Sequence, residues 1–271
     1  MAQNVNSLLT SSLSYRFEKL TEAIKKLHSD HEKDSQLKWF TPHGVSHYES
    51  VENIIRQLLP DDTLGEGIHK LKPSERFFLL SAAWIHDIGM IKGIFGNEDR
   101  RLSDDEIREN HHIRSEKYIV EKFNVIGIEE TEAEVFGLLA RYHRRRTSIS
   151  DCPESVHLIN HGKIRVRLLA AYLRLADALH VDQSRTPAKQ YAITLAYNIP
   201  MNSKLHWLRS MFVIGISIDT KNKEIVLQLK YPCDIEKWEI AENVINNTLY
   251  SIYEFILQDL RDELDTVKEV L

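Results

Sequence analysis

The sequence has 271 residues, of which 42% are hydrophobic and 28% are charged, and this composition excludes a disordered chain. Its 40 acidic side chains outnumber the 35 basic ones, and the formal net charge of −5 provides no global attraction for long nucleic acid or for an anionic membrane surface. The N-terminus lacks the pattern of a signal peptide, and two cysteines, Cys152 and Cys233, favour a reducing compartment over a disulfide scaffold. We therefore expect a cytoplasmic protein of one or two domains, with no membrane partner.

Hydrophobic spacing predicts a mainly α-helical chain up to about residue 188, with no strand in this part. Apolar residues recur at steps of three or four, and glycine and proline are scarce. The segment 77–85 is apolar on nearly every side, which is typical of a helix at the centre of a bundle. We expect helices around 17–27, from Gly44 to Pro60, over 77–85, over 111–123, from Phe136 to His143 and over 163–179.

The pattern changes after residue 187. Segments 191–197, 210–219 and 224–231 alternate or are rich in β-branched residues, and residues 220–223 between the last two are typical of a hairpin turn. We therefore expect a small antiparallel sheet in this part of the chain.

Helical spacing returns from Ile235 and continues to the end of the sequence, which predicts a helix of about 30 residues, roughly 45 Å long. We divide the chain into a helical domain, 1–188, and a C-terminal part, 189–271. The long helix either packs within the chain or mediates a homo-oligomer, and the sequence leaves both alternatives open.

Four of the apolar segments also place a histidine or aspartate on a face that should be buried. His86 and Asp87 close the central helix, and Asp177, His47 and His143 fall on the apolar stripes of three others. An unpaired buried carboxylate is costly, and a divalent cation would offset this cost. Imidazole and carboxylate groups without thiolate suit Zn, Mn, Fe, Ni or Mg and favour a hydrolytic metal centre.

Each of these residues also has an ordinary structural interpretation. A buried histidine is more often held by a backbone carbonyl than by a metal, and Asp177 can cap a helix or pair with Arg174. The coincidence of four such segments favours one shared metal centre over four separate structural roles.

In their order, these residues resemble the HD-domain metal-dependent phosphohydrolases, whose pattern is H, then HD, then optional histidines, then D. The first histidine matches His47, the doublet matches His86 and Asp87, and the last aspartate matches Asp177, within roughly residues 38–186. The resemblance implies an HD-type helical bundle, with a small antiparallel sheet and a long terminal helix after it. It also implies hydrolysis of phosphate bonds by metal-activated water, with Asp87 as a ligand and catalytic group.

The family has a two-metal form, and His111 and His143 match its additional ligands. The resemblance thus implies one or two divalent ions, with Mn, Fe, Ni, Co, Zn or Mg as candidates. Where many family members have HDIGK, this sequence has HDIGM, and Lys92, two residues later, is a substitute for the missing catalytic lysine. The sequence also lacks the HHE motif that some two-metal members have around the position of His143. We expect His112 to act in catalysis and His43 to contact substrate, with plain surface positions as the alternative for both.

Basic residues near the proposed ligands favour a phosphate-containing substrate, because guanidinium groups bind phosphate in a bidentate manner. These residues are Arg141, Arg144, Arg145, Arg146 and Arg185. We expect Arg144, Arg145 and Arg185 to bind substrate, with a solvated surface as the alternative for each. The leading hypothesis is hydrolysis of a nucleotide, by release of triphosphate from a nucleoside triphosphate or by cleavage of a phosphodiester.

The segments FTPHGVSH, 40–47, and HHIRSEKYI, 111–119, most resemble the HD proteins associated with prokaryotic conflict systems. This resemblance implies a defence role with a partner protein. A different hypothesis is a catalytically silent HD module that binds a nucleotide or partner as a sensor. A third, an enzyme that oxidises a small polyol at the metal, would leave the arginines without a role.

Overall fold

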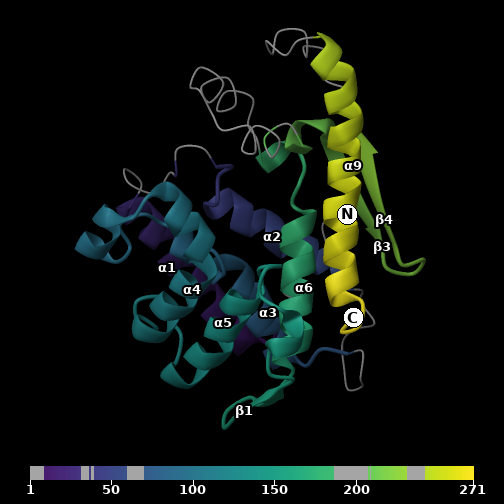
Figure 1. Ribbon diagram of the computed structural model, residues 1–271. Coiled ribbons are helices and arrows are strands. Elements are labelled where there is room, and N and C mark those ends of the chain that lie inside the picture. The colour runs from purple at the N-terminus through teal and green to yellow at the C-terminus, as the bar shows by residue number, and fades with distance from the viewer. Residues whose placement is uncertain are drawn as a thin grey trace.

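The computed structural model describes residues 9–31, 37, 40–59, 70–185, 207, 209–230 and 242–271. The protein is mainly α-helical, as predicted (Figure 1). Its helical bundle contains α1 (Ser11–Asp30), α2 (Val45–Leu58), α3 (Pro73–Ile85), α4 (Asp104–Glu121), α5 (Glu130–Tyr142) and α6 (Val166–Leu179). The predicted strand over 191–197, the predicted domain boundary at 188 and the start of the predicted terminal helix lie outside the described residues.

Shorter elements and a C-terminal part complete the described chain. Four 3₁₀ helices follow α3, α5 and α6: η3 (Ile88–Met90), η4 (Gly96–Arg101), η5 (Ile149–Asp151) and η6 (Gln183–Arg185). Two antiparallel hairpins pair β1 (Val156–Leu158) with β2 (Gly162–Ile164) and β3 (Val213–Asp219) with β4 (Glu224–Leu229). The last helix is α9 (Glu242–Val267).

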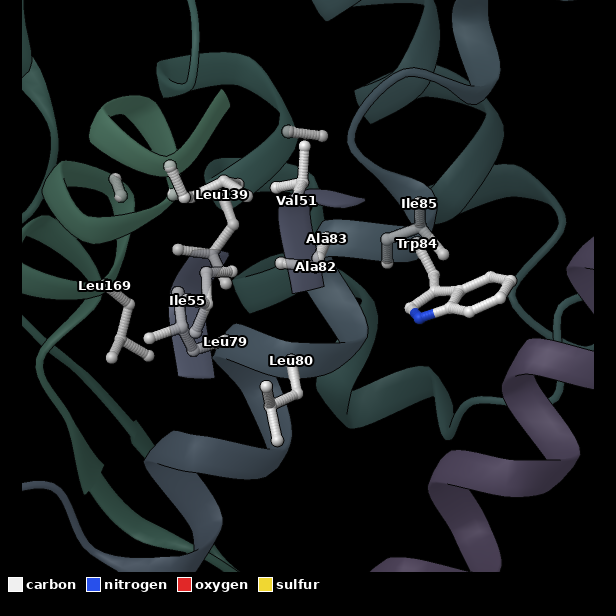
Figure 2. Packing of buried hydrophobic residues seen from close by; sticks show 14 of the residues in the cluster. Val51, Ile55, Leu79, Leu80, Ala82, Ala83, Trp84, Ile85, Leu139 and Leu169 are labelled. Carbon is white, nitrogen blue, oxygen red and sulfur yellow. The ribbon is translucent and has the colours of Figure 1, made fainter. Parts of the chain in front are cut away.

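Helix α3 forms the centre of the bundle because its sequence offers no polar face to solvent. Every residue from Phe77 to Ile85 is buried, and α1, α2, α5 and α6 pack around the helix. Pro73 occupies its first turn, where a helix does not need the N–H group, and Glu75 accepts a hydrogen bond from the backbone N–H of Lys72. Figure 2 shows side chains of α2, α3, α5 and α6 meeting in this core. The C-terminal end of α3 therefore lies in the protein interior.

The structure confirms the first two predicted helices and corrects parts of three other predictions. The expectation of no strand before residue 188 is wrong, because β1 and β2 form a short hairpin whose Leu158 and Ile164 are buried. For the same reason α6 begins at Val166 and not at residue 163. Helix α4 begins seven residues before the predicted 111, because Ser103 and Glu106 form a capping box in a segment without an apolar stripe.

The C-terminal part carries the predicted hairpin and the predicted long helix. The turn between β3 and β4 places Lys223 at φ 55°, and the side chain of Asp219 accepts hydrogen bonds from the backbone N–H groups of Lys221 and Asn222. Helix α9 packs against α6, so the described part of this helix has a partner within the chain. No helix among the described residues has the length and apolar character needed to cross a membrane.

Gly89 lets η3 approach α4 closely, directly after the His86 and Asp87 doublet. A Cβ atom at this position would lie 2.2 Å from the backbone oxygen of His111 and 2.6 Å from the backbone nitrogen of Ser115. The backbone N–H of Gly89 donates a hydrogen bond to the Ser115 hydroxyl at 2.9 Å. The distance between the doublet and His111 thus depends on the absence of a side chain at Gly89.

We expect Gly89→Ala to lower the free energy of unfolding by at least about 2 kcal/mol, because backbone atoms of α4 must move to admit the methyl group. Gly44→Ala is the matched control, since nothing lies within 4 Å of a Cβ atom there, and it should cost less than about 1 kcal/mol. Urea unfolding followed by circular dichroism measures both values. Equal losses in the two variants would contradict this account of η3 and α4.

Candidate metal centre

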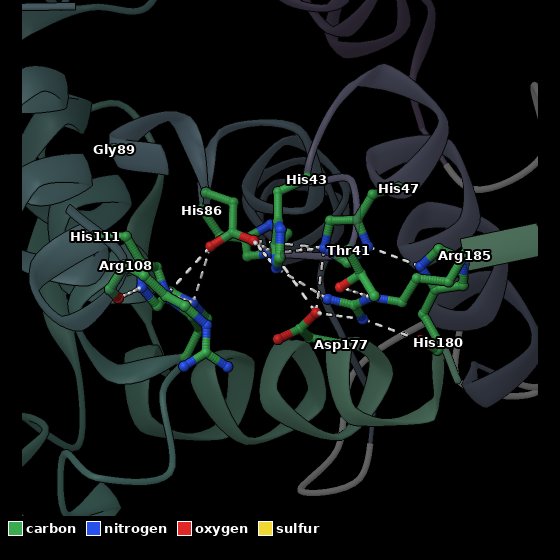
Figure 3. A network of polar contacts seen from close by, with 12 residues as sticks. Thr41, His43, His47, His86, Gly89, Arg108, His111, Asp177, His180 and Arg185 are labelled. Atoms are coloured by element: carbon green, nitrogen blue, oxygen red, sulfur yellow. Dashed lines mark hydrogen bonds and ion pairs between the residues drawn. The ribbon is translucent and has the colours of Figure 1, made fainter. Parts of the chain in front are cut away.

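Five helices bring histidine and aspartate side chains to one point in the interior. His47 lies in the first turn of α2, and His86 caps the C-terminal end of α3 with Asp87 directly after it. His111 lies in α4, His143 caps the C-terminal end of α5, and Asp177 lies in the last turn of α6. The structure thus brings together all six side chains that the sequence analysis proposed as metal ligands, of which Figure 3 labels His47, His86, His111 and Asp177.

One set of these groups surrounds the Oδ2 atom of Asp87. The Nε2 atoms of His47 and His86 each lie 3.5 Å from this oxygen and 3.3 Å from each other. The Oδ1 atom of Asp177 lies 3.2 Å from Nε2 of His47 and 3.8 Å from Nε2 of His86. Two imidazole nitrogens and two carboxylate oxygens therefore converge on this side of Asp87.

A second set faces the other oxygen of the same carboxylate. The Nε2 atoms of His111 and His143 each lie 3.3 Å from Oδ1 of Asp87 and 3.1 Å from each other. The side chain of Asp87 is only 2% exposed. Its two oxygens thus face two separate pairs of imidazoles in a buried environment.

Hydrogen bonds on the far side of the rings fix how three of the imidazoles face this cluster. The Nδ1 atoms of His86, His111 and His143 lie 3.0, 2.5 and 2.5 Å from the backbone oxygens three residues earlier in the chain, so each donates its Nδ1 proton there. In the neutral ring this leaves Nε2 with a free lone pair directed at the cluster. This is the arrangement in which histidine binds a metal ion.

The cluster fits a divalent cation. Among the described residues, the Oδ1 atoms of Asp87 and Asp177 have no hydrogen-bond partner although both are buried. Facing lone pairs and carboxylates in a buried site repel one another unless a positive charge lies between them. Nitrogen and oxygen donors without sulfur suit Zn, Mn, Fe, Co or Ni, and three overlapping sets of these side chains can each hold an ion.

The protonation states of these side chains depend on the balance between burial and the charges of their neighbours. Burial acts to raise the pKa of Asp87, but the charges of His86 and His111 bring it well below its ordinary value. Burial acts to lower the pKa of His86, whereas Asp87 and Asp177 raise it above the ordinary value. Burial lowers the pKa of His111 to about 3. The carboxylates are therefore ionised at neutral pH, and a metal ion competes with the proton on His86.

The cluster lies at the wall of a cavity of about 320 Å³, a size in the lower range of small-molecule sites. Asp87, His111, His143 and Asp177 reach the cavity, and Phe40, Met90 and Trp207 line it with apolar surface. Its basic lining consists of Arg108, Arg144, Arg145, Arg146, Arg174, Arg185 and Arg209. An acidic protein therefore holds a strongly basic cavity beside its buried carboxylates.

Carboxylates already hold several of the arginines that the sequence analysis assigned to substrate. Arg144 and Arg146 both pair with Glu109, and Arg145 pairs with Asp259 of α9 at 2.8 Å. Arg185 donates to the backbone oxygen of His180 at 2.9 Å. These guanidinium groups line the cavity, but their positions are fixed by partners within the chain.

The structure does not bring every predicted residue to the cavity. Lys92 forms an ion pair with Asp104 at 2.6 Å and is not part of the cavity lining. His112 lies beside His111 outside the lining, and burial lowers its pKa to about 4. His43 does line the cavity, and its Nε2 atom lies 4.0 Å from Oδ2 of Asp87.

Sequence reasoning missed three residues of this region: His180, Arg108 and Arg209. It named Arg174 only as an alternative partner of Asp177, but the Arg174 guanidinium donates to the backbone oxygens of Tyr142, Arg144 and Thr147. His180 follows Asp177 by three residues, and its Nδ1 atom lies 2.7 Å from Nδ1 of His47. Arg108 precedes His111 by three residues on α4, and recognition of the Ser103 capping box would have placed it on that helix. Arg209 lies beyond the resemblance, and no sequence signal connects it with the ligands.

We expect divalent transition metals to stabilise the protein against heat, because an ion binds the folded cluster and not the unfolded chain. A free metal concentration about 100 times the dissociation constant adds about 3 kcal/mol. Asp87→Asn removes one charge shared by both sets of imidazoles and should abolish the effect. Asp105→Asn, an exposed change on α4, should retain it. Thermal melting with and without metal measures this, and an unaltered melting temperature in the native chain would contradict it.

Comparison with known proteins gives the family of this chain. The HD-CE family model matches residues 29–266, which include the metal-ligand candidates of the bundle and most of α9. The comparisons with curated proteins and with solved structures gave no match. Because the family match covers most of the chain, this protein belongs to the HD-CE family and carries an HD-type domain.

Proposed function

We propose that this protein is a metal-dependent phosphohydrolase that acts on a nucleotide at a two-ion centre. HD-type domains are generally found in metal-dependent hydrolases. The observation that carries the proposal is the position of Asp87, whose two buried oxygens each lie 3.3 to 3.5 Å from a separate pair of histidine Nε2 atoms. A single structural ion would not need a carboxylate shared between two such sets.

The residues of the chain divide between the two ions. His47, His86 and Asp177 would hold one ion, His111 and His143 the other, and Asp87 would bind both. Divalent ions in such a centre supply a nucleophilic water near neutral pH and polarise a phosphoryl oxygen. The Asp87 carboxylate would orient this water toward the cavity, where we place the scissile phosphate.

Arg108 is the residue that we assign to the substrate phosphates. It lines the cavity one helical turn before His111, and its guanidinium lies 4.7 Å from the centre of the Phe40 ring. Within the part of the chain that the structure describes, no carboxylate forms an ion pair with Arg108. Its charge is therefore available to an anionic ligand, in contrast to the charges of Arg144 and Arg146.

The cavity favours a small anionic substrate with an apolar part. Basic side chains of the lining suit phosphate oxygens, and the apolar surface of Phe40, Met90 and Trp207 suits a nucleobase. The bond cleaved is either the phosphate ester whose hydrolysis releases triphosphate from a nucleoside triphosphate, or a phosphodiester.

Further parts of the proposal depend on the sequence alone. A role in prokaryotic defence with a partner protein depends on the resemblance, a cytoplasmic location depends on cysteine usage and the N-terminal pattern, and a homo-oligomer depends on the apolar stripe of the C-terminal helix. A catalytically silent sensor with the same cavity is the competing function. It predicts nucleotide binding without turnover, so the experiment below distinguishes it from the enzyme.

The direct test is incubation of the full chain with a panel of nucleotides in Mn, Fe, Co, Ni, Zn and Mg, with products resolved by chromatography. We expect hydrolysis in at least one transition metal and none after chelation. Asp87→Ala should abolish turnover, while its helical circular dichroism spectrum stays close to that of the native chain. Binding of nucleotide without any product in every metal would reject the enzyme in favour of the sensor.

Arg108→Ala should raise the KM for the nucleotide about 10- to 100-fold, because a hydrogen bond to a charged group contributes about 1.5–3 kcal/mol. Arg141→Ala is the matched control, since Arg141 pairs with Glu116 at 2.8 Å and does not line the cavity. Steady-state kinetics of both variants in the active metal measures the difference. Equal KM values for Arg108→Ala and the native chain would place the phosphates elsewhere.

A further inference from the structure

We infer that His180 is a positioning residue that fixes the tautomer and orientation of His47, through a hydrogen-bond chain that ends at Ser184 and Asp182. This inference rests on the proposed metal centre, in which His47 is a ligand. Nδ1 of His47 lies 2.7 Å from Nδ1 of His180, Nε2 of His180 lies 3.1 Å from the Ser184 hydroxyl, and that hydroxyl lies 2.5 Å from Oδ1 of Asp182.

His47 differs from the other three histidines of the cluster in how its far nitrogen is satisfied. His86, His111 and His143 each donate Nδ1–H to the backbone oxygen three residues earlier. The corresponding oxygen for His47, on Gly44, accepts from the backbone N–H of His47 itself, and the Nδ1 atom faces another imidazole instead. His47 is 1% exposed and His180 is 3% exposed, so water does not take the place of this contact.

The direction of each hydrogen bond follows from the far end of the chain. A carboxylate only accepts, so the single proton of the Ser184 hydroxyl is donated to Asp182. The Ser184 oxygen is then left to accept from Nε2–H of His180. In a neutral ring this leaves a lone pair on Nδ1 of His180, which accepts the Nδ1 proton of His47. In the neutral ring, the lone pair on Nε2 of His47 is therefore free for the ion that Asp87 and Asp177 would also hold.

Residues 180–184, which form these hydrogen bonds, are held in place by contacts with neighbouring parts of the protein. His180 follows α6 directly, and its ring lies nearly coplanar with that of His47 and meets it edge to edge, with 5.0 Å between centroids and 17° between planes. The backbone N–H of Ser184 also donates to Oδ1 of Asp182 at 2.9 Å. Gln183 donates to the backbone oxygen of Met211 at 3.0 Å, and η6 packs against β3. The C-terminal hairpin thus supports the segment that orients a ligand in the bundle.

Figure 3 shows that His180, where this series of hydrogen bonds meets His47, lies at one side of the metal-ligand cluster. His180 and Arg185 lie beside His47, whereas His111 and Arg108 lie at the opposite side. Loss of His180 should therefore weaken the ion held by His47, His86 and Asp177 and leave the ion held by His111 and His143.

Metal competition with a chromogenic chelator tests the effect on binding in the full chain. We expect His180→Leu to weaken one ion about 10- to 100-fold, the range typical of partners that orient a metal-bound histidine. His180→Asn should recover most of this loss, because its amide oxygen occupies the place of Nδ1 and accepts from His47. Ser184→Ala should give a smaller loss. His157→Leu is the control at an exposed position on β1, and unchanged affinity in His180→Leu would overturn the inference.

A second measurement requires neither metal binding nor activity. Long-range ¹H–¹⁵N correlation spectra of the metal-free, ¹⁵N-histidine-labelled protein at pH 8 report the tautomer of each ring, and His47→Gln and His180→Asn assign the signals. We expect a proton on Nδ1 of His47 and none on Nδ1 of His180, whether or not Nε2 of His47 also carries a proton toward Asp177 in the metal-free protein. A proton on Nδ1 of His180 with none on Nδ1 of His47 would overturn the inference even if metal binds. Absence of metal binding with the expected tautomers would reject the proposed function and support the hydrogen-bond chain.

Discussion

The carboxylate of Asp87, buried at the end of the most apolar helix, is the constraint on which the rest of the site depends. Burying an ionised carboxylate without compensation is strongly unfavourable. The bundle compensates it with imidazoles from α2, α3, α4 and α5, which lie 3.3 to 3.5 Å from its two oxygens. The helices must therefore end and cross where these side chains reach one point, and Gly89 permits the close approach of η3 to α4.

One kind of hydrogen bond, from Nδ1 to a backbone oxygen three residues earlier, orients three of the four histidines. Two of the histidines, His86 and His143, sit at helix C-terminal ends, where carbonyl oxygens of the last turn accept the Nδ1 proton. His111 makes the same bond inside α4. His47 lies at a helix N-terminal end, where the carbonyl of Gly44 is already used, and it takes His180 as its partner. The hydrogen-bond chain of His180 is thus the consequence of where α2 begins.

The sequence predicted the helical core and five of the six converging side chains from local signals, and His111 from the resemblance to the HD-domain phosphohydrolases. Apolar stripes identify α1 and α2, an apolar run identifies α3, and a histidine or aspartate on a buried face is conspicuous in such segments. The β1–β2 hairpin has only three residues in each strand, which is too short for a pattern of alternation. The position of Lys92 depends on Asp104 of α4, a pairing that no spacing in the sequence reveals.

The contacts that decide the chemistry of the cavity are also long-range. Arg145 and Arg209 meet Asp259 of α9, and His180 meets His47, over sequence separations of 50 to 133 residues. A one-dimensional pattern indicates that an arginine or histidine is near the site but not whether its charge or lone pair is already used. His180 was missed for this reason and Arg108 because the start of α4 was not recognised, and these are the two residues to which we assign a role.

The most direct test of the account is the metal content of the purified protein and two variants after saturation with a transition metal and removal of the excess. If Asp87 is shared between two ions, the native chain should hold two ions, His111→Gln one, and Asp87→Ala none. A single ion in the native chain that persists in His111→Gln would contradict the shared carboxylate, and with it the two-ion phosphohydrolase.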